Sequence, residues 1–289
     1  MTNQDSGTWC DYIVKCARVM AIGAMIVSNS AAAEEKPLWE LGAGMGFLII
    51  PDYIGSSEQR VYFFPLPYIT YNGDKLTIDR RGAHTGIIET ENMMLDISLN
   101  AGVPVKSDKN AAREGMPDLL ATIELGPSLE FTLSEDRIKQ REWSLRLPLR
   151  AVIATDLSET DTVGWVFNPH LNFNNKLLWG DWKFGVSAGP MLVTERNADY
   201  YYEVDGQYAR AGRPVYDAKG GYGGARFTLS LRKRFDKIWV GGFARYDYLT
   251  GAVFEDSPLV EQRHALLVGA GISYIFAQSR TWVQVDNGF

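Results

Sequence analysis

The sequence predicts an all-β protein, a transmembrane antiparallel up-and-down β-barrel of about 10–12 strands. Three observations lead to this prediction. Apolar and polar residues alternate along the chain, the alternating runs are unusually long, and tryptophans lie close to the ends of the runs. Strands that cross a membrane need about nine to eleven residues, whereas strands of soluble proteins usually have about five or six.

The alternation is clearest in residues 121–133, where apolar side chains such as Ile123 and Leu125 occupy every second position. The positions between them carry Thr, Glu, Gly and Ser, so one face of the strand is apolar and the other is polar. Similar runs cover 143–153, 165–173, 182–192 and 266–276. The pattern is typical of a barrel with lipid outside and a polar interior. A secreted β-sandwich would also alternate, but on shorter strands.

Tryptophans at or near the expected strand ends favour the membrane barrel over the sandwich. They are Trp39, Trp143, Trp165, Trp182 and Trp239. Tryptophan is enriched where a membrane meets water, so these side chains are expected to form an aromatic girdle.

The expected strands follow in order along the chain: 38–50, 60–71, 75–88, 92–104, 118–133, 141–154, 164–176, 180–193, 222–234, 238–249 and 263–276. They number eleven, but bacterial single-chain barrels have an even number of strands. A short extra strand near 200–204 would give twelve, and merging a weak early strand would give ten. With a periplasmic N-terminus, eleven strands place the 105–117 connection in the periplasm, where turns are normally short. Either the early count is wrong by one, or the periplasmic surface is enlarged.

The stretch P-L-P-Y at 65–68 falls inside one of these expected strands. Proline has no backbone N–H to donate to a sheet, so Pro65 and Pro67 predict a local bulge. The Asn72-Gly73 pair that follows is a strong signal for a two-residue hairpin turn.

Residues 1–33 are predicted to be a secretory signal peptide that is cleaved after Ala33, and residues 34–289 are predicted to form the barrel. Two basic residues precede the apolar core at 19–27, and the segment ends in an Ala-x-Ala pattern. This core is too short for a transmembrane helix, which needs about 20 residues. Because Cys10 and Cys16 both lie in this segment, the exported chain would have no disulfide and no thiolate metal site.

Charged residues on the polar strand faces are expected to meet in the barrel interior. The expected cluster comprises Glu124, Glu130, Arg146, Arg150, Arg226, Arg245 and Asp247. A barrel of about 10–12 strands leaves little bore, and opposite charges pair inside it. We therefore expect a filled, ion-paired interior. The alternative is an open channel in which the same arginines form an anion-selective lining.

No residue pattern indicates an enzyme, a metal or a cofactor. His84, His170 and His264 are scattered, which makes a poor metal site, and no nucleophile motif accompanies them. His170 is expected to face the interior, and His264 starts a strand near Glu261. The glycine-rich 220–224 lacks the Lys-Ser/Thr pair of a phosphate-binding loop. The net charge of -6 also argues against a nucleic-acid partner.

Several separated motifs occur along residues 34–289. They are P-D-Y-I-G-S at 51–56, P-L-P-Y at 65–68 with the Y-N-G-D that follows, G-G-Y-G-G-A-R at 220–226, A-R-Y-D-Y-L at 244–249 and D-S-P-L-V at 256–260. In this order they resemble the MipA/OmpV family of outer-membrane proteins, also called MltA-interacting proteins.

The resemblance implies a non-enzymatic barrel of the Gram-negative outer membrane, in contact with membrane lipid. It implies a scaffold that brings a lytic murein transglycosylase and a penicillin-binding protein together for peptidoglycan synthesis and remodelling. The alternatives are a narrow porin-like channel and a surface adhesin or stress-response protein. An adhesin would use the loop 194–219, which contains Tyr200, Tyr201, Tyr202, Tyr208 and Tyr216. Clustered tyrosines suit an interface, but we favour an aromatic girdle for them.

Two groups of loop residues are the expected binding positions if the chain contacts a partner through its loops. They are Asp52, Tyr53 and Gly55, and Asp256, Ser257 and Pro258. Asp, Gly, Ser and Pro are also ordinary turn residues, and turn formation is the simpler interpretation of these positions.

Overall fold

The computed structural model describes residues 34–73, 77–79, 82–84, 88–90, 92–136, 138–156, 158, 160–178 and 180–285. The predicted signal peptide lies outside these residues, so its cleavage stays a prediction. The chain divides into two units. The described residues of the smaller unit belong to a two-stranded sheet of β1 (Glu34–Pro37) and β16 (Trp282–Val285). The larger unit spans residues 36–283.

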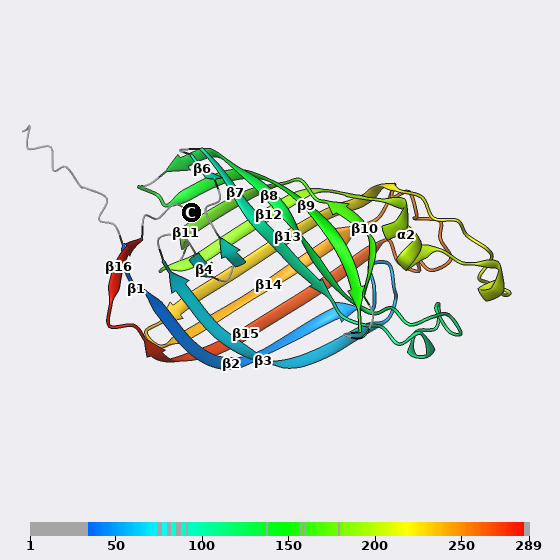
Figure 1. The fold of residues 1–289 in the computed structure, drawn as a ribbon, viewed down its shortest axis with the longest axis horizontal. Helices are drawn as coiled ribbons and strands as arrows, with labels where there is room; N and C mark the ends of the chain where they lie inside the picture. The colour runs from blue at the N-terminus through cyan, green and yellow to red at the C-terminus, as the bar shows by residue number, and fades with distance from the viewer. Residues whose placement is uncertain are drawn as a thin grey trace, which may run out of the picture. The chain divides into compact units, whose positions relative to one another are not determined.

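The larger unit is built on one antiparallel sheet, whose long strands lie side by side (Figure 1). The long strands are β2 (Trp39–Pro51), β3 (Gln59–Asn72), β7 (Met93–Gly102), β8 (Ala121–Asp136), β9 (Arg141–Thr155), β10 (Thr160–Phe167), β11 (His170–Leu178), β12 (Trp182–Val193), β13 (Gly221–Phe235), β14 (Ile238–Tyr248) and β15 (His264–Gln278). The short strands β4 (Thr77–Asp79), β5 (Gly82–His84) and β6 (Ile88–Glu89) lie between β3 and β7 in the sequence. Strand β15 pairs with β2, which joins the last long strand to the first.

The sheet curls around a polar interior, so the larger unit is a β-barrel. Residues of β7, β9, β12, β13 and β14 line one internal cavity, although β7 and β14 are far apart in the order of the sheet. At the edges of the sheet, β5 lies beside β7, which brings together the two ends of the strand order. The prediction of an all-β antiparallel fold is confirmed.

Alternation along each strand separates an apolar outer face from a polar inner face. On β13, Phe227 and Leu229 are 48% and 50% exposed, whereas Arg226 turns to the interior and pairs with Asp247 of β14. Further exposed apolar residues include Met45, Phe63, Leu99, Ile123, Leu266, Ile272, Trp39, Trp143 and Trp165. An apolar surface of this extent suits contact with lipid rather than with water.

The described part of the chain contains ten long strands when β10 and β11 count as one. Both pair with β9 on one side and β12 on the other, and only Asn168 and Pro169 separate them. Pro169 cannot donate to the ladder, so the break falls where the sequence lacks an N–H. Ten is the lower end of the expected range, and it is even, as a bacterial barrel requires.

Several local predictions are wrong. In the region predicted as the strand 75–88, the described residues form only β4, β5 and the start of β6, which removes one strand from the count. The alternative of an extra strand near 200–204 is excluded, because helix α2 (Glu195–Tyr202) occupies most of this stretch. The connection at Asn72-Gly73 has four residues instead of two, because Asn72 pairs with Thr77. Among the described residues, no helix has the length and apolar character needed to cross a membrane.

The predicted bulge at Pro65 and Pro67 is also wrong. Strand β3 keeps an unbroken register with β2 through both prolines. On its other side, the described residues of β3 pair only at Tyr71 and Asn72, with β4. The prolines therefore lie on a strand edge where a missing N–H removes no ladder hydrogen bond.

Connections differ in length at the two ends of the barrel. At one end, here called the loop end, the strands are joined by the long 52–58, 103–120, 194–220 and 249–263 and by the short 156–159. At the opposite end, here called the turn end, short connections such as 137–140, 179–181 and 236–237 join the strands, together with the longer 73–92. The long 105–117 connection thus lies with the other long loops, and the early strand count is wrong by one.

Candidate functional site

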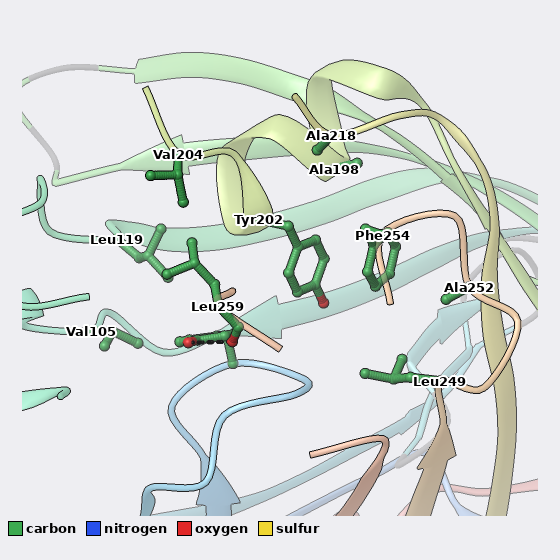
Figure 2. Close-up of a cluster of buried hydrophobic side chains, with 11 residues drawn as sticks. Val105, Leu119, Ala198, Tyr202, Val204, Ala218, Leu249, Ala252, Phe254 and Leu259 are labelled. Carbon is green, nitrogen blue, oxygen red and sulfur yellow. Dashed lines mark hydrogen bonds between the residues drawn. The ribbon is translucent and has the colours of Figure 1, made fainter. Parts of the chain in front are cut away.

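The four long segments at the loop end pack on one another, and together they are called the loop cap (52–58, 103–120, 194–220 and 249–263). Its buried apolar side chains come from all four segments: Tyr53; Val105 and Leu119; Ala198, Tyr202, Val204 and Ala218; and Leu249, Ala252, Phe254 and Leu259. Figure 2 shows Tyr202 facing Phe254. The two ring centroids are 3.9 Å apart, and the ring planes differ by 10°. The loop cap therefore has a hydrophobic core of its own.

The hydroxyl groups of three consecutive tyrosines in helix α2 contact three different residues. Successive residues of a helix point about 100° apart, so each ring reaches a different partner. The Tyr200 hydroxyl accepts from the backbone N–H of Leu120 at 2.8 Å, and the Tyr202 hydroxyl donates to the carbonyl oxygen of Ile54 at 2.9 Å. The Tyr201 hydroxyl lies 3.5 Å from Thr122 Oγ1. These tyrosines pack inside the loop cap, so the expectation that they belong to an interface girdle is wrong.

Burial in the loop cap raises the pKa of Tyr53, Tyr201 and Tyr202 above the ordinary value. A raised tyrosine pKa stabilises the fold below about pH 10, and this stability is lost as the pH rises further. Titration of the native protein followed by ultraviolet absorbance is expected to show at least these three phenols still protonated at about pH 11, whereas all of them ionise in denaturant. Equal titration curves in both states would contradict the buried arrangement.

Asp52 ties two segments of the loop cap together. Its carboxylate accepts from Arg60 Nε at 2.6 Å and Arg60 Nη2 at 2.9 Å, and from Asn110 Nδ2 at 3.0 Å. Asn110 Nδ2 also donates to Ser56 Oγ at 3.0 Å. Because Asn110 belongs to 103–120, this buried group links the first long segment to the second.

The other predicted loop residues lie at the same end. The Tyr53 hydroxyl donates to the carbonyl oxygen of Leu259 at 2.8 Å, and Ser257 Oγ donates to the carbonyl oxygen of Tyr202 at 2.7 Å. Gly55 has a φ of 103°, which favours glycine. Its carbonyl oxygen accepts from the N–H of both Glu261 and Gln262. Asp256 is exposed, 3.8 Å from Arg263, and Pro258 is half-buried. The structure thus brings all six residues to the loop cap, and a binding role for them stays a prediction.

Two arginines hold segments of the loop cap together, and the sequence analysis did not predict this role. Arg113 donates to the carbonyl oxygens of Tyr201 at 3.1 Å and Pro117 at 3.2 Å, and its guanidinium lies 5.8 Å from the centre of the Tyr53 ring. Arg213 donates to the carbonyl oxygens of Ala112, Glu114 and Tyr208. Burial lowers the pKa of Arg113, although arginine stays charged in proteins. Both arginines fasten 103–120 to 194–220, and an isolated arginine in a loop gives no sequence signal of such a role.

The charged residues predicted for the interior meet there in pairs. Arg150 Nε lies 2.8 Å from Glu124, and Arg146 contacts both Asp96 and Glu130. On the later strands, Asp247 accepts from Arg226 Nε at 2.6 Å and Arg245 Nε at 3.0 Å. All seven predicted residues take part, and Asp96 of β7 is an eighth member that the sequence analysis did not include.

A cavity of about 220 Å³ lies inside the barrel among these side chains. Arg150, Arg226 and Arg245 contribute cationic groups to its lining. Asn100, Asn168, His170, Ser187 and Thr228 contribute neutral polar groups. Among the described residues that line it, none is acidic.

The histidines that the structure describes take part in local hydrogen bonds. No group of three or more His, Cys, Asp or Glu side chains there could hold a metal ion. The Nδ1–H of His170 donates to the carbonyl oxygen of Asn168 at 2.7 Å, and His264 Nδ1 lies 2.5 Å from the Tyr246 hydroxyl. Glu261 accepts from Ser57, and the His84 side chain lies outside the described residues.

Comparison with known proteins agrees with the motifs in the sequence. The family described as MltA-interacting protein MipA matches residues 43–276. Two relatives bear the name MltA-interacting protein, one from Escherichia coli (strain K12) and one from Shigella flexneri. Each is 26% identical over 278 residues, which cover 90% of this chain and 98% of the relative. The resemblance is confirmed, and the chain belongs to the MltA-interacting protein MipA family.

Proposed function

We propose that the chain is a non-enzymatic outer-membrane barrel that binds a lytic murein transglycosylase. The observation that carries this proposal is the family match, which runs from β2 to β15 and includes relatives named for an interaction with MltA. Supporting it, the outer face of the barrel is apolar over its long strands, as contact with membrane lipid requires. We further propose that a penicillin-binding protein joins the same complex, where a shared scaffold raises the effective concentration of each enzyme for the other.

The lengths of the connections support one orientation in the membrane. Outer-membrane barrels have short periplasmic turns and longer extracellular loops. The turn end would then face the periplasm, where murein enzymes work, and the loop cap would face outward. A periplasmic partner would therefore dock on turns such as 137–140 and 236–237, and on the 73–92 connection. In this orientation the six predicted loop residues shape the loop cap and do not touch that partner.

Site-specific photo-crosslinking in native outer membranes tests both the partner and the orientation. Ile138 of the turn end is 91% exposed, and Val215 of the loop cap is 62% exposed, so they are matched apolar positions at opposite ends. A photo-reactive residue at Ile138 or at Lys237 is expected to capture a murein transglycosylase, identified by mass spectrometry. The same residue at Val215 is expected not to capture it.

Other patterns of crosslinking would change or extend the proposal. Capture from Val215 alone would reverse the proposed docking face. Capture from none of the three positions, in a correctly folded and located barrel, would remove the transglycosylase as a partner of this chain. A penicillin-binding protein that is recovered only when the transglycosylase is present would support the larger complex.

A narrow channel is the second candidate, and the arginine-lined cavity is the observation that favours it. The loop cap argues against it, because four segments pack around a buried core at the end of the barrel where ions would leave. Single-channel recordings in planar bilayers distinguish the two functions, since a scaffold needs no conductance.

A further inference from the structure

The cavity inside the barrel is lined by a dense group of positive side chains. Arg150 comes from β9, Arg226 from β13 and Arg245 from β14, so three strands direct guanidinium groups to one space. The volume of about 220 Å³ corresponds to roughly seven water molecules at about 30 Å³ each. This is enough space for one small anion with some of its water.

The carboxylates beside the cavity are shared unevenly among the arginines. Glu124 accepts from Arg150, whereas a single carboxylate, Asp247, serves both Arg226 and Arg245. The neighbouring Arg146 contacts two carboxylates, Asp96 and Glu130, so the four arginines and four carboxylates of the interior balance in number. The guanidinium groups nonetheless line the cavity, whereas no carboxylate is among its described lining residues, and this separation of charge favours an anion there.

Hydrogen-bond donors remain available in the same place. Arg226 and Arg245 each use only Nε toward Asp247, and their terminal nitrogens have no partner among the described residues. Ser187 of β12 and Thr228 of β13 lie directly opposite each other in the ladder. Both line the cavity, and no described residue accepts a hydrogen bond from their hydroxyls.

We propose that this cavity is a binding site for one small oxyanion, of the size of phosphate or acetate. Guanidinium groups recognise carboxylate and phosphate oxygens through paired N–H donors, which is the chemistry that Arg226 and Arg245 present. The anion would accept from the terminal guanidinium nitrogens and the two hydroxyls. This site differs from a channel because it holds its ion, whereas conduction requires weak binding at several sites. It does not depend on the partner proposed above.

The test uses the complete barrel in detergent, with inorganic phosphate and acetate as probes. Binding is measured by titration calorimetry at constant ionic strength, with chloride as the replaced anion. Ser187→Asp places a carboxylate in the cavity without breaking an ion pair, and it is expected to weaken binding at least about tenfold. Ser230→Asp is the matched control, because Ser230 lies two residues beyond Thr228 on the same face of β13 and does not line the cavity. It is expected to weaken binding much less.

A second variant keeps the test decisive if Ser187→Asp folds poorly. Arg245→Gln removes one guanidinium but leaves the pair between Arg226 and Asp247, and it is also expected to weaken binding at least about tenfold. Saturable binding of phosphate or acetate that both cavity variants lose would support the site. No binding of either anion by the wild-type barrel, or equal affinity in wild type and both cavity variants, would overturn it.

Discussion

Replacing Phe254 by alanine is expected to lower the stability of the loop cap by about 3–5 kcal/mol, as for other large side chains removed from a core. Phe254 is only 1% exposed, and its ring stacks on Tyr202. The side chains around the ring refill such a cavity only in part. Limited proteolysis of the barrel in detergent is expected to show rapid cleavage within 194–220 and 249–263.

The neighbouring residue provides the control for this change. Val253 is 37% exposed, so Val253→Ala is expected to change proteolysis little. Tyr202→Phe keeps the stacked ring and removes only the hydrogen bond to Ile54, which is expected to cost about 1 kcal/mol. If Phe254→Ala and Val253→Ala were cleaved at the same rate, the loop cap would not be a cooperative packed core.

Replacing Leu229 by lysine is expected to destabilise the barrel in lipid by about 2–4 kcal/mol, the cost of a cation near the middle of a lipid-facing strand. Leu229 lies near the centre of β13 and is 50% exposed on its outer face. Urea unfolding of the barrel in lipid vesicles measures the change. The same substitution in detergent is expected to cost less, because a micelle lets the lysine reach water.

Ser230→Lys is the matched control for the membrane-facing change. Ser230 is the next residue of β13, so its side chain points to the interior rather than to lipid. Its replacement is expected to change stability within about 0.5 kcal/mol. Equal destabilisation by the two lysines would contradict the assignment of the apolar face to the membrane.

The long strands could be predicted from the sequence because the alternation of apolar and polar residues depends only on the order of residues along each strand. A residue such as Leu125 or Leu229 faces outward whatever its neighbours do, since side chains alternate with a period of two. The predicted strand 118–133 accordingly corresponds to β8, and 222–234 corresponds to β13. The interior ion pairs follow from the same period, because Glu130 and Arg146 are directly opposite in adjacent strands.

The loop cap could not be predicted in this way. Its core joins residues more than a hundred positions apart, such as Tyr53 and Leu259, and no local period marks them. Tyr200, Tyr201 and Tyr202 favour a strand by intrinsic preference, yet they lie in α2 because each ring finds a partner in the cap. The bulge predicted at the prolines of β3 was wrong for a similar reason. The sequence alone does not reveal that β3 lies at an edge of the sheet.

The hydrogen bonds of Arg113 and Arg213 in the loop cap are expected to persist at acidic pH. Both guanidinium groups end on backbone carbonyl oxygens, which have no proton to gain in the range where carboxylates titrate. Ion pairs with carboxylates weaken as the carboxylates become protonated. The hydrogen bonds of Arg113 and Arg213 to carbonyl oxygens do not weaken in this way. In the orientation proposed here, the link between 103–120 and 194–220 on the face turned toward the surrounding medium thus includes bonds whose strength does not depend on the acidity of that medium.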